Sequence, residues 1–125
     1  MSEALSPPAW VTVVVVSGVF GLLVHELGHV LAAGAMGGTG LRLRLGWPAL
    51  RIEATLPDEP GFEIVFLLAG ALANFGGAAA LWGFGGVCRV AALVQIMVAV
   101  AALLPIGTSD GARLWAHLKA QRDGA

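Results

Sequence analysis

The sequence predicts an all-α integral membrane protein with three transmembrane helices and a short β-hairpin between the first and the second. Of its 125 residues, 58% are hydrophobic and only 12% are charged, and the mean hydropathy is +0.84. A water-soluble domain of this length exposes much of its chain and needs a more polar composition. Three apolar stretches, at 10–36, 62–82 and 87–106, are near or above the roughly 20 residues that cross the hydrocarbon core as a helix.

Charge and cysteine content narrow the class of protein. The net charge is −1, so electrostatics give no support to a nucleic-acid partner. The single cysteine, Cys88, cannot form an internal disulfide, and no Cys/His cluster indicates a structural zinc. Residues 1–125 leave no room for a second domain, so we expect one membrane-embedded unit.

The first apolar stretch is expected to be a retained span rather than a signal peptide, because no Lys or Arg precedes Arg42. Six of the seven basic residues would lie on one side of the membrane: Arg42, Arg44, Arg51, Arg113, Lys119 and Arg122. This excess predicts an N-terminus outside and a C-terminus in the cytoplasm. The short architecture favours a bacterial-type plasma membrane.

The connection between the first two spans predicts the hairpin. Residues 41–54, LRLRLGWPALRIEA, alternate apolar and polar positions on both sides of a Gly-Trp-Pro-Ala turn, a pattern typical of two paired strands. An isolated hairpin is marginal in water, so we expect it to lie against the membrane face or the helices. A basic loop that only fixes topology is an alternative of equal weight. The tail at 111–122 predicts a short amphipathic helix.

The segment HELGH, residues 25–29, predicts a metal site inside the first span. His25 and His29 are four residues apart, so on a helix they project from one face, one turn above the other. Two neutral imidazoles so placed can bind one Zn²⁺, and Glu26 between them can act as general base toward a water at the zinc. The alternative is a polar cluster that pairs with itself, but ionisable residues within a span are costly and usually functional.

A third protein ligand is expected, which leaves one position for water. Asp110 follows a Pro and a Gly that should break the third helix, whereas His117 is the rival in the amphipathic tail. At a rise of about 1.5 Å per residue, His25 lies roughly 22 Å along its helix from Trp10, nearer the cytoplasmic side. Asp110, at the cytoplasmic end of the third span, reaches a similar depth, and His117 falls outside. The depth argument therefore favours Asp110.

The second span contributes GALAN, residues 70–74. Small residues at Gly70 and Ala73 allow close approach of helices. For Asn74, a substrate-facing or oxyanion-binding role and an interhelical hydrogen bond have equal weight. For Gln95 in the third span, an interhelical hydrogen bond is the favoured role.

These elements together resemble the site-2 protease family of intramembrane zinc metalloproteases. The matching residues are HELGH at 25–29, GALAN at 70–74 for the GxxxN element of the family, and SDG at 109–111 for its DG motif. The resemblance implies that His25, His29 and Asp110 are zinc ligands and that Glu26 is the catalytic base. The sequence departs from the family pattern at Ala102, where an Asn is usual, and at Gly107, where a second proline is usual.

We therefore expect an intramembrane zinc endopeptidase, holding one Zn²⁺, that cleaves a peptide bond within or next to a transmembrane segment. Its substrate would be a membrane protein with a single span, and an accessory membrane subunit or a homo-oligomer could seal the site. A catalytically inactive zinc-binding scaffold or regulator is the alternative, which Ala102 favours and Glu26 opposes. A plain structural membrane subunit would leave the polar residues without a role.

Overall fold

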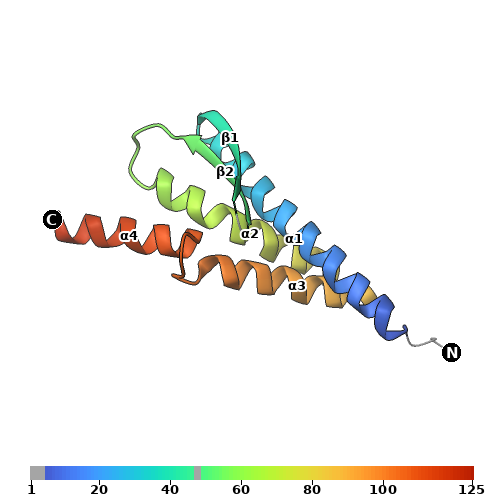
Figure 1. Ribbon diagram of the computed structural model, residues 1–125. Coiled ribbons are helices and arrows are strands. Elements are labelled where there is room, and N and C mark those ends of the chain that lie inside the picture. Colours follow the sequence, from blue (N-terminus) through green and yellow to red (C-terminus); the bar gives the residue numbers. More distant parts are fainter. Residues whose placement is uncertain (1–4, 47–48) are drawn as a thin grey trace.

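The computed structural model describes residues 5–46 and 49–125, and this part of the chain forms helices joined by one hairpin (Figure 1). In chain order the elements are α1 (Pro7–Ala35), β1 (Thr39–Gly46), β2 (Ala49–Thr55), α2 (Phe62–Trp82), α3 (Gly86–Leu103) and α4 (Asp110–Asp123). The expected order of three long helices with a hairpin after the first is confirmed. Within the predicted turn, Trp47 and Pro48 lie outside the described residues.

Three of these helices are long and apolar enough to cross a membrane. α1, α2 and α3 have 29, 21 and 18 residues, and their most apolar windows have mean hydropathies of 2.0, 2.0 and 2.1. Large apolar side chains cover their outer surfaces, among them Val11, Val15, Leu31, Leu72 and Met97. Such a surface is compatible with lipid and unfavourable in water.

The inner face of α1 is made of small and polar residues. The buried positions of α1 form one stripe along the helix: Ser17, Gly21, His25, Gly28, His29 and Ala33. At Gly28 the backbones come closest, because a Cβ there would lie 2.5 Å from the Ala69 carbonyl oxygen and 2.8 Å from the Ala73 Cβ. The predicted close approach of small residues on the second span is thus present, with Gly28 as its counterpart on α1.

The ends of the helices follow from local chemistry. α1 begins at Pro7, earlier than the predicted residue 10, because a proline suits the first helical position. α3 ends at Leu103, short of the predicted residue 106, since Leu104 precedes Pro105 and is extended. α4 begins at Asp110, where the Ser109 Oγ accepts a hydrogen bond from the Ala112 N–H at 3.1 Å. The predicted tail helix is therefore present, and it includes Asp110 as its first residue.

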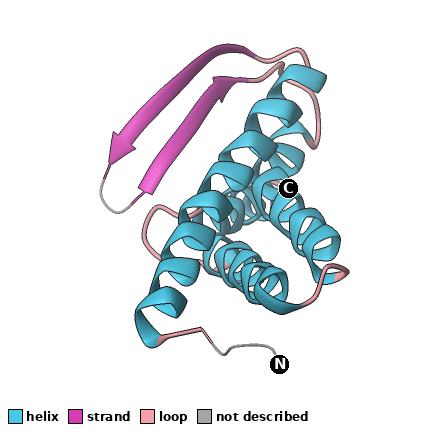
Figure 2. Cartoon of the chain, turned by 90° about the vertical axis from the view of Figure 1, so that its right-hand side faces the viewer, coloured by secondary structure: helices cyan, strands magenta, loops and turns pink. Residues whose placement is uncertain are grey.

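The hairpin turns back from the end of α1 and lies alongside that helix (Figure 2). β1 and β2 are antiparallel, with Leu43 opposite Ile52 and Arg44 opposite Arg51. Two contacts tie β2 to the rest of the fold: the Ile52 N–H donates to the Glu26 carboxylate on α1, and the Arg51 guanidinium donates to the Thr108 carbonyl in the turn before α4. The hairpin prediction is confirmed, and its strands rest against the helices rather than forming a simple loop.

A small apolar cluster joins the hairpin, the helices and α4 at one end of the bundle. Its buried members are Ala33, Phe66 and Leu67, and around them pack Met36, Ala54, Leu56 and Leu114. These residues come from α1 and the residue after it, from α2 and α4, and from β2 and the loop after it. The cluster therefore fixes the position of α4 relative to the paired histidines of α1.

We expect Gly28→Ala to lower the free energy of unfolding by about 1–3 kcal/mol, because the added Cβ meets backbone and must push α1 from α2. Thermal unfolding in detergent would measure the change. Gly18→Ala is the matched control on the same helix, since nothing lies within 4 Å of its added Cβ. Equal stability of both variants would contradict the close contact at Gly28.

Candidate metal centre

The helical spacing of α1 places two imidazoles on its inner face. His25 and His29 are 5% and 3% exposed, and both rings point between α1 and α2. Their Nε2 atoms are 3.2 Å apart. Two ring nitrogens this close, screened from water, require a proton or a cation between them, because their lone pairs otherwise repel.

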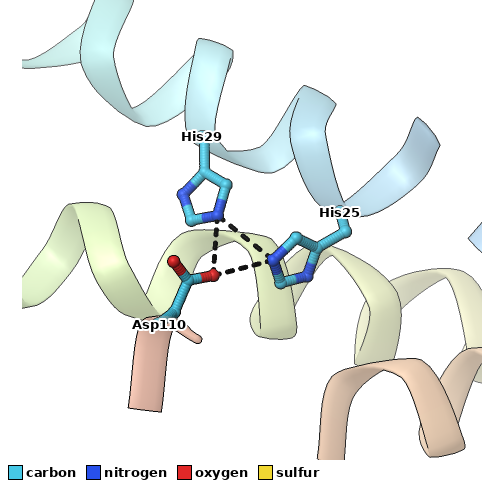
Figure 3. A group of neighbouring side chains, drawn as sticks. All are labelled: His25, His29 and Asp110. Atoms are coloured by element: carbon cyan, nitrogen blue, oxygen red, sulfur yellow. Dashed lines mark hydrogen bonds and ion pairs between the residues drawn. The ribbon is translucent and has the colours of Figure 1, made fainter. Parts of the chain in front are cut away.

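Asp110 brings a carboxylate to these nitrogens from the far end of the chain. Its Oδ2 lies 2.8 Å from the His25 Nε2 and 3.0 Å from the His29 Nε2 (Figure 3). Its side chain is 12% exposed, and it enters the site as the first residue of α4. The break after α3 and the Ser109 cap thus turn the carboxylate toward α1.

The three ligand atoms fit a divalent cation of the size of zinc. Around a tetrahedral ion with bonds of about 2.0–2.1 Å, ligand atoms are about 3.3 Å apart. The observed separations of 2.8, 3.0 and 3.2 Å form a slightly tighter triangle, so a small outward movement admits the ion. Two imidazole nitrogens and one carboxylate oxygen are donors that zinc accepts. The His25–His29–Asp110 group can therefore hold a metal ion.

His29 is oriented by the main chain of α2. Its Nδ1 lies 2.8 Å from the Phe66 carbonyl oxygen, which can only accept a hydrogen bond, so Nδ1 carries the proton. The Nε2 lone pair is then directed to the centre, as ligand histidines require. The Phe66 ring also packs on His29, with ring centroids 4.8 Å apart.

His25 is held by the GALAN segment of α2. A Cβ at Gly70 would lie 2.5 Å from the His25 Cε1, so the absence of a side chain at this position makes room for the ring. One turn later, the Asn74 Nδ2 lies 3.5 Å from the His25 Nδ1. The glycine and the asparagine of this segment thus touch the same imidazole, a role for Gly70 that differs from the helix contact expected from the sequence.

Arg113 supports Asp110 from one turn along α4. Its Nη1 lies 4.0 Å from the Asp110 Oδ1, and its Nη2 lies 3.4 Å from the Glu63 Oε1 at the start of α2. Burial tends to raise the pKa of Asp110, but hydrogen bonds with His25 and His29 outweigh it and hold that pKa well below its usual value. Asp110 is therefore an anion, the form that binds a cation.

The Glu26 carboxylate contacts the hairpin. Its Oε2 accepts the Ile52 N–H at 2.8 Å, so the base expected from the sequence and strand β2 are in direct contact. His117 lies in α4, where its Nε2 is 3.1 Å from the Gln121 Nε2, outside the metal-binding group. Gln95 is fully buried, and neither of its amide atoms has a hydrogen-bond partner among the described residues, so the expected interhelical bond is not formed there.

Sequence reasoning missed three contributors to the site: the Phe66 carbonyl, the Ile52 N–H and Arg113. The first two are main-chain groups, which no residue type reveals. Arg113 carries a weak signal, because it follows Asp110 by three residues on a helix.

Replacing His25, His29 or Asp110 by alanine is expected to weaken zinc binding by at least about 100-fold, since even contacts behind the ligands contribute 10–100-fold. Metal analysis of purified protein, with titration against a chelator, would measure the effect. His117→Ala is the control and should bind as tightly as wild type. Full metal content in the Asp110→Ala variant would contradict the site.

Gly70→Ala should also weaken zinc binding, because the new methyl group displaces the His25 ring. The same titration would detect the change. Gly76→Ala, on the same helix with nothing within 4 Å of its added Cβ, is the matched control. If the two alanine variants bind alike, the His25 ring does not depend on the space at Gly70.

Comparison with known proteins supplies no family for this chain. No family model, curated protein or solved structure matches it. Within residues 5–46 and 49–125, three helices are long and apolar enough to span a membrane, and a His-His-Asp group can hold a metal ion.

Proposed function

We propose that this chain is an intramembrane zinc endopeptidase, which cleaves a peptide bond within or next to a transmembrane segment of another membrane protein. The observation that carries the proposal is the His25–His29–Asp110 group, enclosed among helices apolar enough to span a membrane. Ionisable residues at such a depth are costly unless they serve a function. The resemblance of HELGH, GALAN and SDG to site-2 proteases supports the same activity.

The chemistry of each side chain assigns it a role, as metal ligand or as general base. His25 and His29 would hold the ion through Nε2, and Asp110 would hold it through Oδ2. Zinc bound there supplies Lewis acidity, which polarises the scissile carbonyl and acidifies a water. The Glu26 carboxylate takes a proton from the attacking water and passes it to the amine nitrogen as the C–N bond breaks.

Water can approach this centre from the end of the bundle where α4 begins. Residues 104–108, between α3 and α4, are exposed and directly precede Asp110. The basic residues of the first connection and the tail support a cytoplasmic location for this end. We therefore propose a multi-pass protein of a bacterial-type plasma membrane, with its N-terminus outside and its site open toward the cytoplasm.

The edge of β2 offers a place for the substrate. The Ile52 N–H is directed at Glu26 on α1, so the edge of β2 at this residue runs past the proposed base. A single-span substrate that unwinds and pairs along this edge would bring its peptide bonds next to Glu26. A second copy of the chain or an accessory subunit would shield the unwound segment from lipid.

A catalytically inactive zinc-binding scaffold is the second candidate. The hydrogen bond between Glu26 and the Ile52 N–H favours it, because this bond gives the carboxylate a structural role in docking the hairpin. Ala102, at the position where site-2 proteases usually have an asparagine, also favours the scaffold. The two candidates differ in one property, the cleavage of a substrate by the zinc-loaded protein.

Glu26→Gln should bind zinc as wild type does, and its rate of cleavage should be about 100-fold to 10,000-fold lower, because general-base catalysis contributes about that much. The amide oxygen can still accept the Ile52 N–H, so the hairpin stays docked. Cleavage of single-span substrates in vesicles, with zinc content measured in parallel, tests this. Glu59→Gln, in the exposed loop before α2, is the control.

Two results would count against the protease. One is equal cleavage by wild type and Glu26→Gln, which would show that Glu26 is not the general base. The other is a zinc-loaded wild type that cleaves no member of a broad panel of single-span substrates, which would leave the scaffold as the function.

A further inference from the structure

Asn74 is the buried polar side chain whose hydrogen bonding is incomplete beside the metal centre. Its side chain is 0% exposed, and its Oδ1 has no hydrogen-bond partner among the described residues. Its Nδ2 lies 3.5 Å from the His25 Nδ1, a long contact. A buried amide oxygen without a donor is unfavourable, and an N–H on the adjacent His25 ring would supply one.

The position of this contact on the ring separates Asn74 from the reacting groups. The Nε2 of His25 faces Asp110 and His29, whereas Asn74 lies at Nδ1, the other ring nitrogen. Asn74 thus lies at the ring nitrogen that does not face Asp110 and His29. Its geometry suits the orientation of a ligand better than contact with the substrate.

Binding of a cation decides what His25 needs at Nδ1. A neutral imidazole that donates its Nε2 lone pair to a cation carries its proton on Nδ1. That N–H then requires an acceptor. Rotation of the Asn74 amide by half a turn exchanges Nδ2 and Oδ1 with almost no change of shape, and it places the unpartnered oxygen at Nδ1.

We propose that Asn74 is a positioning residue of the metal centre, whose Oδ1 accepts the His25 Nδ1–H when the centre holds a divalent cation. This inference rests on the proposed metal site. It assigns the tautomer of His25 in that site, with the proton on Nδ1. His29 already has the same arrangement, because its Nδ1 is paired with the Phe66 carbonyl oxygen. Both ligand histidines are then oriented from α2, one by a main-chain oxygen and the other by a side-chain oxygen.

The test compares zinc affinities of full-length variants in detergent by competition with a chelator. Asn74→Leu and Asn74→Ala remove the acceptor and should weaken binding about 10–100-fold, the range for groups that orient metal-bound histidines. Asn74→Asp keeps an acceptor oxygen and should bind at least as tightly as wild type.

Gln95→Leu is the matched control, because Gln95 is also 0% exposed, with an amide that lacks partners among the described residues. It should bind zinc as wild type does. A general effect of losing a buried amide would lower the affinity of the Gln95 and Asn74 variants alike.

The outcomes separate this inference from the metal site itself. Wild type that binds no divalent cation would overturn both. Wild type that binds zinc, with Asn74→Leu equally tight or Asn74→Asp as weak as Asn74→Leu, would overturn the role of Asn74 alone. Failure of both the Leu and Ala variants to fold, with Gln95→Leu folded, would show that Asn74 is structural and overturn it too.

Discussion

One carboxylate oxygen links α1 to the first residue of α4. The Asp110 Oδ2 contacts the Nε2 atoms of two histidines that precede it by 85 and 81 residues. For this contact, α3 must stop before Pro105 and α4 must start at Asp110. Gly111 allows the turn, because a Cβ at this position would collide with the Leu103 carbonyl. The short segment between α3 and α4 thus directs the Asp110 carboxylate back into the bundle.

The bundle gives the polar groups of the centre partners from other elements. The main chain of α2 accepts a hydrogen bond from His29, the histidines of α1 contact Asp110, and β2 donates to Glu26. In a medium without water, such pairing decides whether a polar group is tolerated. The apolar surface suits a membrane, and at the polar centre neighbouring elements supply hydrogen bonds that lipid would not.

Much of this arrangement could be predicted from the sequence, because its signals are local. Hydropathy located the three long helices, alternation located the strands, and the spacing of His25 and His29 placed both rings on one face. A depth argument brought Asp110 to the same level. Contacts that depend on the packing of helices could not be predicted: Gly70 was read as a spacer between backbones, whereas it accommodates the His25 ring. The main-chain donor of Ile52 had no signature at all.

The hydrogen bond between Ile52 and Glu26 has a kinetic consequence. A single N–H cannot donate fully to two acceptors, so an incoming extended peptide that pairs with β2 at Ile52 competes with the Glu26 carboxylate for the same hydrogen. Under the proposed function, arrival of the peptide would release the carboxylate, and its departure would restore the hydrogen bond between Ile52 and Glu26. Glu26 would then be free to act as a base only while a peptide is paired with β2.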